Sequence, residues 1–152
     1  MMTKKKLSGV VIPAVTPLTE ERKLDGAAVE RMFGNFRQHK VHPFILGTTG
    51  EAASLPLSLK TDFLRLAGKL KKEEDVLYAG ISSNCVAESI DLAKQSFDSG
   101  ADVVVTTLPS YYPLTDGAML RYFEELADRI SGPLMVYNIP ATTNMSIPLE
   151  VI

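Results

Sequence analysis

The 152-residue sequence has a single cysteine, Cys85, and only two histidines, His39 and His42. One cysteine excludes a disulfide within the chain, so we expect a reducing, cytoplasmic location and interpret Cys85 as a buried, unreactive thiol. Both histidines precede the apolar run at 44–46, and we expect them to be structural or exposed. Without a histidine after a strand, neither a Ser-His-Asp triad nor a histidine-rich zinc site can be assembled from this segment.

The chain also lacks a strong charge imbalance and a long hydrophobic run. Its net charge is -2, with 45% hydrophobic and 22% charged residues, which is an ordinary globular composition. Such a balance indicates neither a nucleic-acid partner nor a membrane partner. Three lysines at 4–6 precede an apolar run, but Pro13 and Pro17 interrupt it, so we interpret the start as a solvated tail rather than a signal peptide.

Five short apolar runs recur roughly thirty residues apart, the length of one strand, one helix and their loops. They are Val10–Ile12, Phe44–Leu46, Val76–Tyr78, Val103–Val105 and Leu134–Val136. Between them the apolar residues take the spacing of amphipathic helices. Asp25 and Ser58 are candidate helix starts, Gly100 is a candidate helix end, and Ser146 followed by Pro148 is a further start.

Runs that are apolar throughout predict a parallel sheet covered on both faces. A doubly wound sheet usually has a glycine-rich turn after its first strand, but residues 13–17 contain no glycine, which favours a (β/α)₈ TIM barrel. Such barrels need about 250 residues, and this sequence supplies only the first five strands. We therefore expect residues 1–152 to be the N-terminal part of a single barrel domain, with the remainder outside this chain. The unfinished helical pattern at 149–152 agrees with this expectation.

The segment Gly47-Thr48-Thr49-Gly50-Glu51 follows the second apolar run and precedes a helical pattern. Glycines permit close approach of the backbone, threonine hydroxyls donate hydrogen bonds, and a helix start favours negative charge. These properties suit a small carboxylate or phosphate. The same residues would also make an ordinary turn with a helix cap.

Hydroxyl groups follow three of the predicted strands. Thr48 and Thr49 follow the second strand, Tyr111 and Tyr112 follow the fourth, and Tyr137 follows the fifth. In a barrel these positions meet at one face, where active sites are built. A series of hydroxyls can relay a proton, because each both donates and accepts a hydrogen bond. The alternative is that the tyrosines only pack.

Three motifs in this order resemble the dihydrodipicolinate synthase and N-acetylneuraminate lyase family of class I aldolases. They are Gly-Thr-Thr-Gly-Glu at 47–51, Pro-Ser-Tyr-Tyr-Pro at 109–113 and Tyr-Asn-Ile-Pro-Ala at 137–141, and the likeness extends from about Gly9 to the end. The resemblance implies a (β/α)₈ barrel, usually a homotetramer, in which a lysine forms a Schiff base with pyruvate. It implies carbon–carbon bond formation or cleavage with an aldehyde, and no metal or organic cofactor.

The resemblance also assigns roles by position. Thr48 and Thr49 would hold the pyruvate carboxylate, Tyr137 would be the acid–base residue, and Tyr111 would be linked to Tyr137 through Thr48. In many relatives the residue matching Tyr111 or its neighbour also packs at a subunit interface.

Two departures from the family pattern bear on function. Synthases that use aspartate semialdehyde usually carry an arginine where this chain has Thr142, which cannot pair a second carboxylate in bidentate fashion. The motifs look more like those of lyases acting on sialic acid or keto-deoxy sugar acids, while dihydrodipicolinate synthase remains the alternative.

The second departure is the lysine. No lysine follows a predicted strand, so the Schiff-base lysine would lie on a sixth strand beyond Ile152, and we expect this chain alone to be inactive. A competing hypothesis is a non-catalytic half-barrel that binds a ligand or assembles with another chain.

Overall fold

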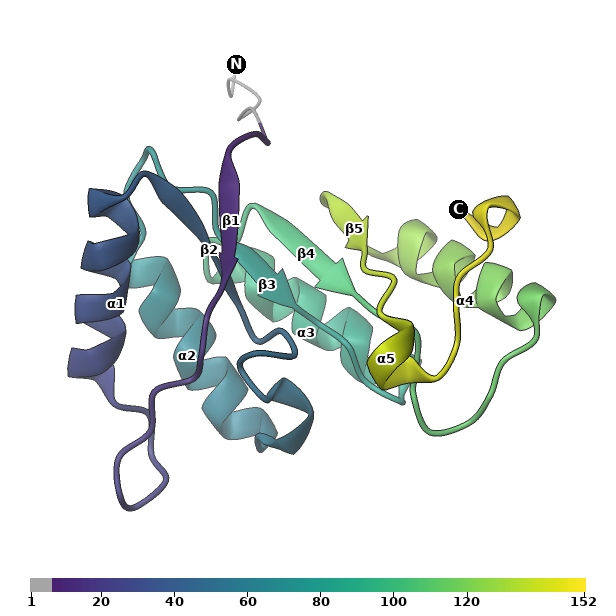
Figure 1. The fold of residues 1–152 in the computed structure, drawn as a ribbon, viewed down its shortest axis with the longest axis horizontal. Helices are drawn as coiled ribbons and strands as arrows, with labels where there is room; N and C mark the ends of the chain where they lie inside the picture. The colour runs from purple at the N-terminus through teal and green to yellow at the C-terminus, as the bar shows by residue number, and fades with distance from the viewer. Residues whose placement is uncertain (1–6) are drawn as a thin grey trace.

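Strands and helices alternate along the chain in the computed structural model, which describes residues 7–152 (Figure 1). The strands are β1 (Val10–Pro13), β2 (Val41–Ile45), β3 (Tyr78–Gly80), β4 (Val103–Thr106) and β5 (Leu134–Val136). The α-helices are α1 (Gly26–Gln38), α2 (Leu57–Leu70), α3 (Val86–Asp98), α4 (Asp116–Arg129) and the short α5 (Pro140–Thr143). Two 3₁₀ helices are η1 (Ala52–Ser54) and η2 (Leu149–Val151).

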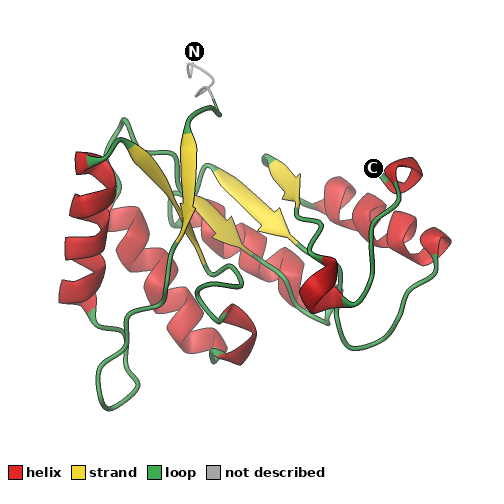
Figure 2. Ribbon diagram, viewed as in Figure 1, coloured by secondary structure: helices red, strands yellow, loops and turns green. Residues whose placement is uncertain are grey.

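The five strands form one parallel sheet in the order β1-β2-β3-β4-β5. Because every strand pairs with the next along the chain, the sheet has no point at which the strand order reverses, as a doubly wound sheet would. Helices α1 to α4 follow one another along one side of the curved sheet, each touching the next (Figures 1 and 2). The predicted barrel architecture, with five of its strands present, is confirmed.

Apolar side chains cover both faces of the sheet, as the uninterrupted apolar runs predict. On β4, Val104 packs in the core between sheet and helices, whereas Val103 and Val105 point to the opposite face. There they join Phe44 and Tyr78 in a second buried cluster on the concave side of the sheet. Successive side chains of this strand therefore pack into two different hydrophobic clusters, one on each face of the sheet.

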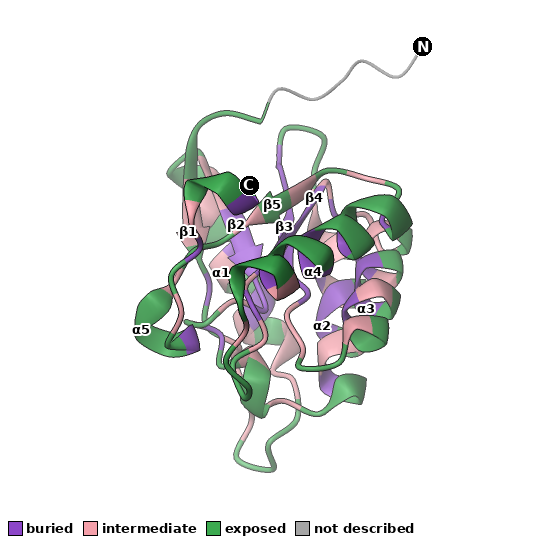
Figure 3. Cartoon of the chain, turned by 90° about the vertical axis from the view of Figure 1, so that its right-hand side faces the viewer, coloured by how far each residue is buried: buried purple, intermediate pink, exposed green. Residues whose placement is uncertain are grey.

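The two outer strands are less buried than the central ones (Figure 3). Val10 of β1 is 57% exposed and Met135 of β5 is 44% exposed, while all of β4 is buried. Each outer strand lacks a neighbour on one side within the described residues, which is the geometry of a barrel wall rather than of a closed barrel.

Two of the predicted helix boundaries are confirmed. Asp25 caps α1, since its carboxylate accepts a hydrogen bond of 2.9 Å from the amide of Ala28. Gly100 follows α3 with φ of +102°, a left-handed conformation that suits glycine at a helix end.

At two other predicted starts a helix does begin nearby, but the predicted serine is not its cap. Helix α2 begins at Leu57 after Pro56, so Ser58 lies inside its first turn rather than at its cap. Pro148 is the residue before η2, and Ser146 caps nothing there. In both cases a proline with extended backbone stands directly before the first helical residue and makes no side-chain hydrogen bond to the helix. The fixed φ of proline is compatible with this place at a helix start.

Single positions depart from the sequence expectation as well. Cys85 is exposed at the start of α3, so the prediction of a buried thiol is wrong. His42 lies inside β2 rather than before it, because the strand begins three residues before the apolar run at 44–46.

The histidines nevertheless lie at the opposite end of the sheet from the strand carboxyl ends, as expected. His42 accepts a hydrogen bond from the amide of Val76 at Nδ1, and its Nε2 lies 3.2 Å from the carbonyl oxygen of Ser8. Both ring nitrogens of His42 therefore lie within hydrogen-bonding distance of backbone groups. The predicted lysine-rich tail at 4–6 lies outside the described residues.

Candidate active site

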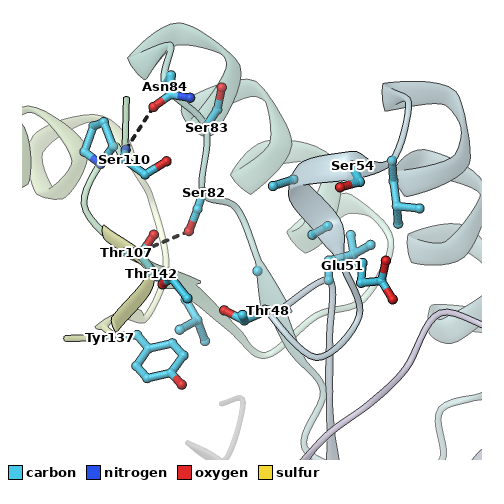
Figure 4. A pocket seen from close by; sticks show the side chains of 18 of the residues that line it. Thr48, Glu51, Ser54, Ser82, Ser83, Asn84, Thr107, Ser110, Tyr137 and Thr142 are labelled. Atoms are coloured by element: carbon cyan, nitrogen blue, oxygen red, sulfur yellow. Dashed lines mark hydrogen bonds between the residues drawn. The ribbon is translucent and has the colours of Figure 1, made fainter. Parts of the chain in front are cut away.

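A cavity of about 590 Å³ opens at the carboxyl ends of the strands (Figure 4). Segments that follow β2, β3, β4 and β5 all contribute to its wall, together with η1, α2 and α3. Hydroxyl side chains dominate the polar lining, and they are Thr48, Ser54, Ser82, Ser83, Thr107, Ser110, Tyr137, Thr142 and Thr143.

Thr48 and Tyr137 both line this cavity, although 89 positions separate them in the sequence, and they lie on the same side of it in Figure 4. Thr49 and Tyr111 do not line it. Both are exposed, and each directly follows a lining residue in the sequence: Thr49 follows Thr48, and Tyr111 follows Ser110. The structure thus brings two of the four predicted site residues into one cavity and leaves the other two beside it.

The turn that carries Thr48 begins with a strained residue. Leu46, which is buried, adopts φ of +56°, and Glu51 at the other end of the turn adopts φ of +51°. Non-glycine residues in the left-handed region cost of the order of 1–3 kcal/mol, and such strain is typical of functional sites. Here it turns the chain sharply at the end of β2 and places Thr48 over the cavity.

The two glycines of this turn are required by packing. A Cβ atom on Gly47 would come within 2.9 Å of the Phe44 ring, and one on Gly50 within 3.0 Å of the Ala14 carbonyl oxygen. The Thr16 hydroxyl also donates a hydrogen bond of 2.7 Å to the carbonyl of Gly50. The segment after β1 therefore packs against the turn and is hydrogen-bonded to it.

The amides of the turn fall into two groups. Those of Gly50, Glu51 and Ala52 donate to carbonyls within the turn. Those of Thr48 and Thr49 have no hydrogen-bond acceptor among residues 7–152.

The predicted contribution of a helix dipole is wrong, because no long helix starts at the turn. The three-residue η1 comes next, and α2 begins only at Leu57. The dipole effect is confined to the first turn of a helix. Binding of an anion here would thus rest on hydroxyls and free amides.

Tyr137 continues the pairing of β5 with β4 one residue beyond the strand. Its amide donates a hydrogen bond of 2.8 Å to the carbonyl of Thr106, which fixes the backbone. Its ring meets that of Phe44 edge to face, with 6.5 Å between the ring centroids. The side chain is 36% exposed, and no hydrogen bond joins its hydroxyl to that of Thr48 within the described part of the chain. A ligand or water can therefore reach the hydroxyl.

Tyr111 lies in the loop after β4 and is 75% exposed. Its ring packs against that of Tyr112, edge to face at 4.8 Å between centroids. Its backbone is more firmly held, since the side-chain oxygen of Asn84 accepts hydrogen bonds from the amides of Ser110 and Tyr111.

Sequence reasoning missed the contribution of β3. Ser82, Ser83 and Asn84 all line the cavity, and the Ser82 hydroxyl accepts a hydrogen bond of 2.9 Å from the amide of Thr107. The predicted strand ended at Tyr78, whereas β3 ends at Gly80. The Ser-Ser-Asn stretch was a usable signal once the strand is extended by these two residues.

Lys60 requires a second correction. It belongs to α2, as predicted, but it lines the cavity, and burial lowers the pKa of its amine. The carboxylate of Glu88 opposes this shift, and Glu88 itself accepts a hydrogen bond of 2.7 Å from Ser83. The expectation that no lysine follows a strand holds for Lys60, but the sequence did not indicate that a helical lysine would reach the cavity.

Behind the cavity, Tyr122 of α4 supports the end of β4. Its hydroxyl lies 3.0 Å from that of Thr106 and 3.2 Å from the carbonyl oxygen of Thr107. Burial raises the pKa of Tyr122, and the hydrogen bond with Thr106 partly offsets the shift. A buried neutral phenol thus fixes the strand from which the Tyr111 loop departs.

The sequence profile described as "Dihydrodipicolinate synthetase family" matches residues 6–152. The chain belongs to this family. Proteins similar to it include an uncharacterised DapA-like lyase of Thermococcus kodakarensis, which is 36% identical over 145 residues. That match covers 94% of this chain and 49% of the relative, so the chain spans about half the length of the curated relatives it matches.

Solved structures of the family superpose closely on this half. A 4-hydroxy-tetrahydrodipicolinate synthase from Methylacidiphilum fumariolicum SolV is 26% identical with a TM-score of 0.91, covering 96% of this chain and 49% of that one. YagE of Escherichia coli K12, determined in complex with pyruvate, is 27% identical with a TM-score of 0.88, covering 92% and 47%. The fold is therefore half of a dihydrodipicolinate synthetase family barrel.

Among residues 7–152, no cluster of three or more His, Cys, Asp and Glu side chains could hold a metal ion. Within the same residues, every helix is too short or too polar to cross a membrane.

Proposed function

We propose that this chain forms the N-terminal half of a pyruvate-dependent lyase or synthase that makes or breaks a carbon–carbon bond through a Schiff base. The observation that carries the proposal is the presence of Thr48 and Tyr137 in one cavity at the carboxyl ends of the strands. Membership of the family supports the reaction class. The pyruvate complex of YagE supports the choice of 2-oxo acid.

The roles follow from the available hydrogen-bonding groups. The amides and hydroxyls of Thr48 and Thr49 would bind the pyruvate carboxylate, because neither amide has another acceptor among residues 7–152. Tyr137 would move a proton to or from the oxygen of the aldehyde, since it lines the cavity and is partly exposed. Tyr111 would exchange that proton with solvent through Thr48.

The amine that condenses with pyruvate would come from a lysine on a sixth strand, outside this chain. Its attack on the pyruvate carbonyl releases water and leaves an imine, which withdraws electrons from the neighbouring methyl carbon. That carbon loses a proton and attacks the aldehyde, and the reverse sequence cleaves the product. The imine supplies the electron sink, so the proposal needs no metal or organic cofactor.

For the second substrate we propose an uncharged, hydroxylated aldehyde of the kind released from keto-deoxy sugar acids or sialic acid. Thr142 lines the cavity where related synthases carry arginine. The charged residues of the lining are two acids, Glu51 and Glu88, and one base, Lys60. A surplus of acid disfavours a second carboxylate, whereas the hydroxyl lining suits a sugar chain.

Dihydrodipicolinate synthase activity is the second candidate. Several similar curated proteins carry the name 4-hydroxy-tetrahydrodipicolinate synthase, among them one from Caldicellulosiruptor saccharolyticus that is 29% identical.

For assembly we propose a homo-oligomer, a dimer or tetramer, in which Tyr111 and Tyr112 reach a neighbouring subunit. Their exposure, 75% and 73%, supports this role.

Reduction with borohydride in the presence of pyruvate tests the proposal on the complete protein. A stoichiometric pyruvyl adduct is expected, and its absence would favour a non-catalytic binding or assembly module. Cleavage assays with keto-deoxy sugar acids and condensation assays with aspartate semialdehyde then distinguish the two candidate enzymes.

A further inference from the structure

The loop after β4 is held to the rest of the molecule by side chains of the loop after β3. The last backbone hydrogen bond between these strands joins the Ile81 amide to the Val105 carbonyl. Beyond it, Ser82 accepts from the amide of Thr107, and Asn84 accepts from the amides of Ser110 and Tyr111. Beyond the end of the sheet, the side chains of Ser82 and Asn84 therefore supply the hydrogen bonds between the two loops (Figure 4).

Asn84 makes the outer of these two attachments. Its Oδ1 atom lies 2.9 Å from the Ser110 nitrogen and 3.1 Å from the Tyr111 nitrogen. Only the oxygen of a carboxamide can accept two amide protons, so the orientation of the group is fixed. The Tyr111 side chain makes no hydrogen bond within residues 7–152, and the one aromatic ring that it meets there, Tyr112, is itself exposed.

We propose that Asn84 is a positioning residue that sets the place of Tyr111 by binding the Ser110 and Tyr111 amides with one oxygen. The inference rests on the proposed function, because it gives Tyr111 a part in proton transfer. In this role Asn84 acts through the backbone amides of Ser110 and Tyr111 and not through contact with the substrate. Replacing it should therefore change turnover rather than the binding of pyruvate, which is assigned to Thr48 and Thr49.

The test uses the complete protein and the variants Asn84→Ala and Asn84→Asp. The alanine variant loses the acceptor, and kcat should fall about 10- to 100-fold with little change in KM for pyruvate, as for a misplaced catalytic group. The aspartate variant keeps an acceptor oxygen and should recover most of the loss. Asn35→Ala, an exposed asparagine of α1, is the matched control and should leave kcat unchanged.

A double-mutant cycle separates positioning from general destabilisation. If Asn84 works through Tyr111, adding Asn84→Ala to Tyr111→Phe should lower kcat less than twofold further. Hydrogen exchange of the peptide that contains Ser110 and Tyr111 should be faster in Asn84→Ala and near the parent rate in Asn84→Asp.

Either of two results would overturn the inference: a kcat for Asn84→Ala within twofold of the parent, or losses that multiply in the double variant. If the unsubstituted protein shows no pyruvate-dependent turnover, the proposed function itself fails. The two failures are therefore distinguishable.

Discussion

The carbonyl group of Leu46 occupies the space beside Gly80 in which a Cβ atom would lie. Leu46 is the strained residue that starts the Thr48 turn, and Gly80 ends β3 on the neighbouring strand. The contact is possible only because position 80 has no side chain. A glycine on one strand thus permits the conformation of the turn on the next.

Gly80→Ala should therefore both destabilise the protein and displace Thr48. We expect a loss of about 1–3 kcal/mol in the free energy of unfolding, from overpacking against backbone. Urea denaturation measures it. Gly34→Ala is the control: nothing lies within 4 Å of its added Cβ in α1, and the change should stabilise by about 0.5–1 kcal/mol. Equal effects of the two substitutions would contradict the packing argument.

Tyr137→Phe in the complete protein should reduce kcat by about 10²–10⁴-fold, since the ring and its contact with Phe44 remain while the hydroxyl that we propose as the proton-transferring group is lost. Steady-state kinetics with pyruvate measure the change. Tyr112→Phe should have a much smaller effect, because the relay role is assigned to Tyr111. Retention of more than about half of the parent kcat would make Tyr137 a structural residue.

The 152-residue chain alone should form no imine with pyruvate, because no lysine of residues 7–152 stands at the carboxyl end of a strand. Borohydride reduction followed by intact-mass measurement checks this, and the complete protein should give the adduct in parallel. Lys60 is the residue to inspect if an adduct appears, as it lines the cavity and burial lowers its pKa.

Glu88→Gln offers a separate test of the Lys60 environment. Glu88 raises the pKa of Lys60 against the larger effect of burial, so removing its charge should lower that pKa further. A larger fraction of neutral amine would then react with an acylating reagent near pH 8. Peptide mass spectrometry should show faster labelling of Lys60 in the variant, with exposed Lys69 on the same helix as the reference. Slower labelling would contradict the assigned electrostatics.

Tyr122→Phe should cost about 1–2 kcal/mol at pH 7, because Thr106 and the Thr107 carbonyl lose a buried partner. The pKa of Tyr122 is raised above its ordinary 10.0 in the folded state, so the unfolded chain loses this proton first as pH rises. That contribution to stability is complete below pH 10 and declines above it. The difference between variant and parent should therefore narrow in alkaline urea titrations, and a constant difference would argue against the raised pKa.

Much of the fold could be predicted because its signals are local. The apolar runs at 10–12, 103–105 and 134–136 reappear as β1, β4 and β5, and the helical spacing between runs gives α1 to α4. Each pattern reports the buried face of one element, which depends on the side chains of that element alone. The three motifs at strand ends likewise indicated the family, which the comparison confirms.

Boundaries and site membership needed the tertiary structure. Because β3 ends two residues later than predicted, the sequence analysis did not identify Ser82 and Asn84 as residues at a strand end. Helix α2 begins only at Leu57, so its dipole does not act on the Thr48 turn as expected. Pairing with neighbouring strands decides where a strand ends, and a window of sequence does not contain those neighbours.

The sequence by itself determined the strand–helix repeat, the parallel sheet and the delivery of Thr48 and Tyr137 to the same end of that sheet. Only the tertiary structure decided that Lys60, from the side of a helix, enters the cavity while Tyr111 stays outside it. The physical reason is that the order of elements fixes which ends of the strands meet. The side chains that share a cavity depend instead on how separate elements are rotated and packed against one another, which close contacts such as Leu46 on Gly80 determine.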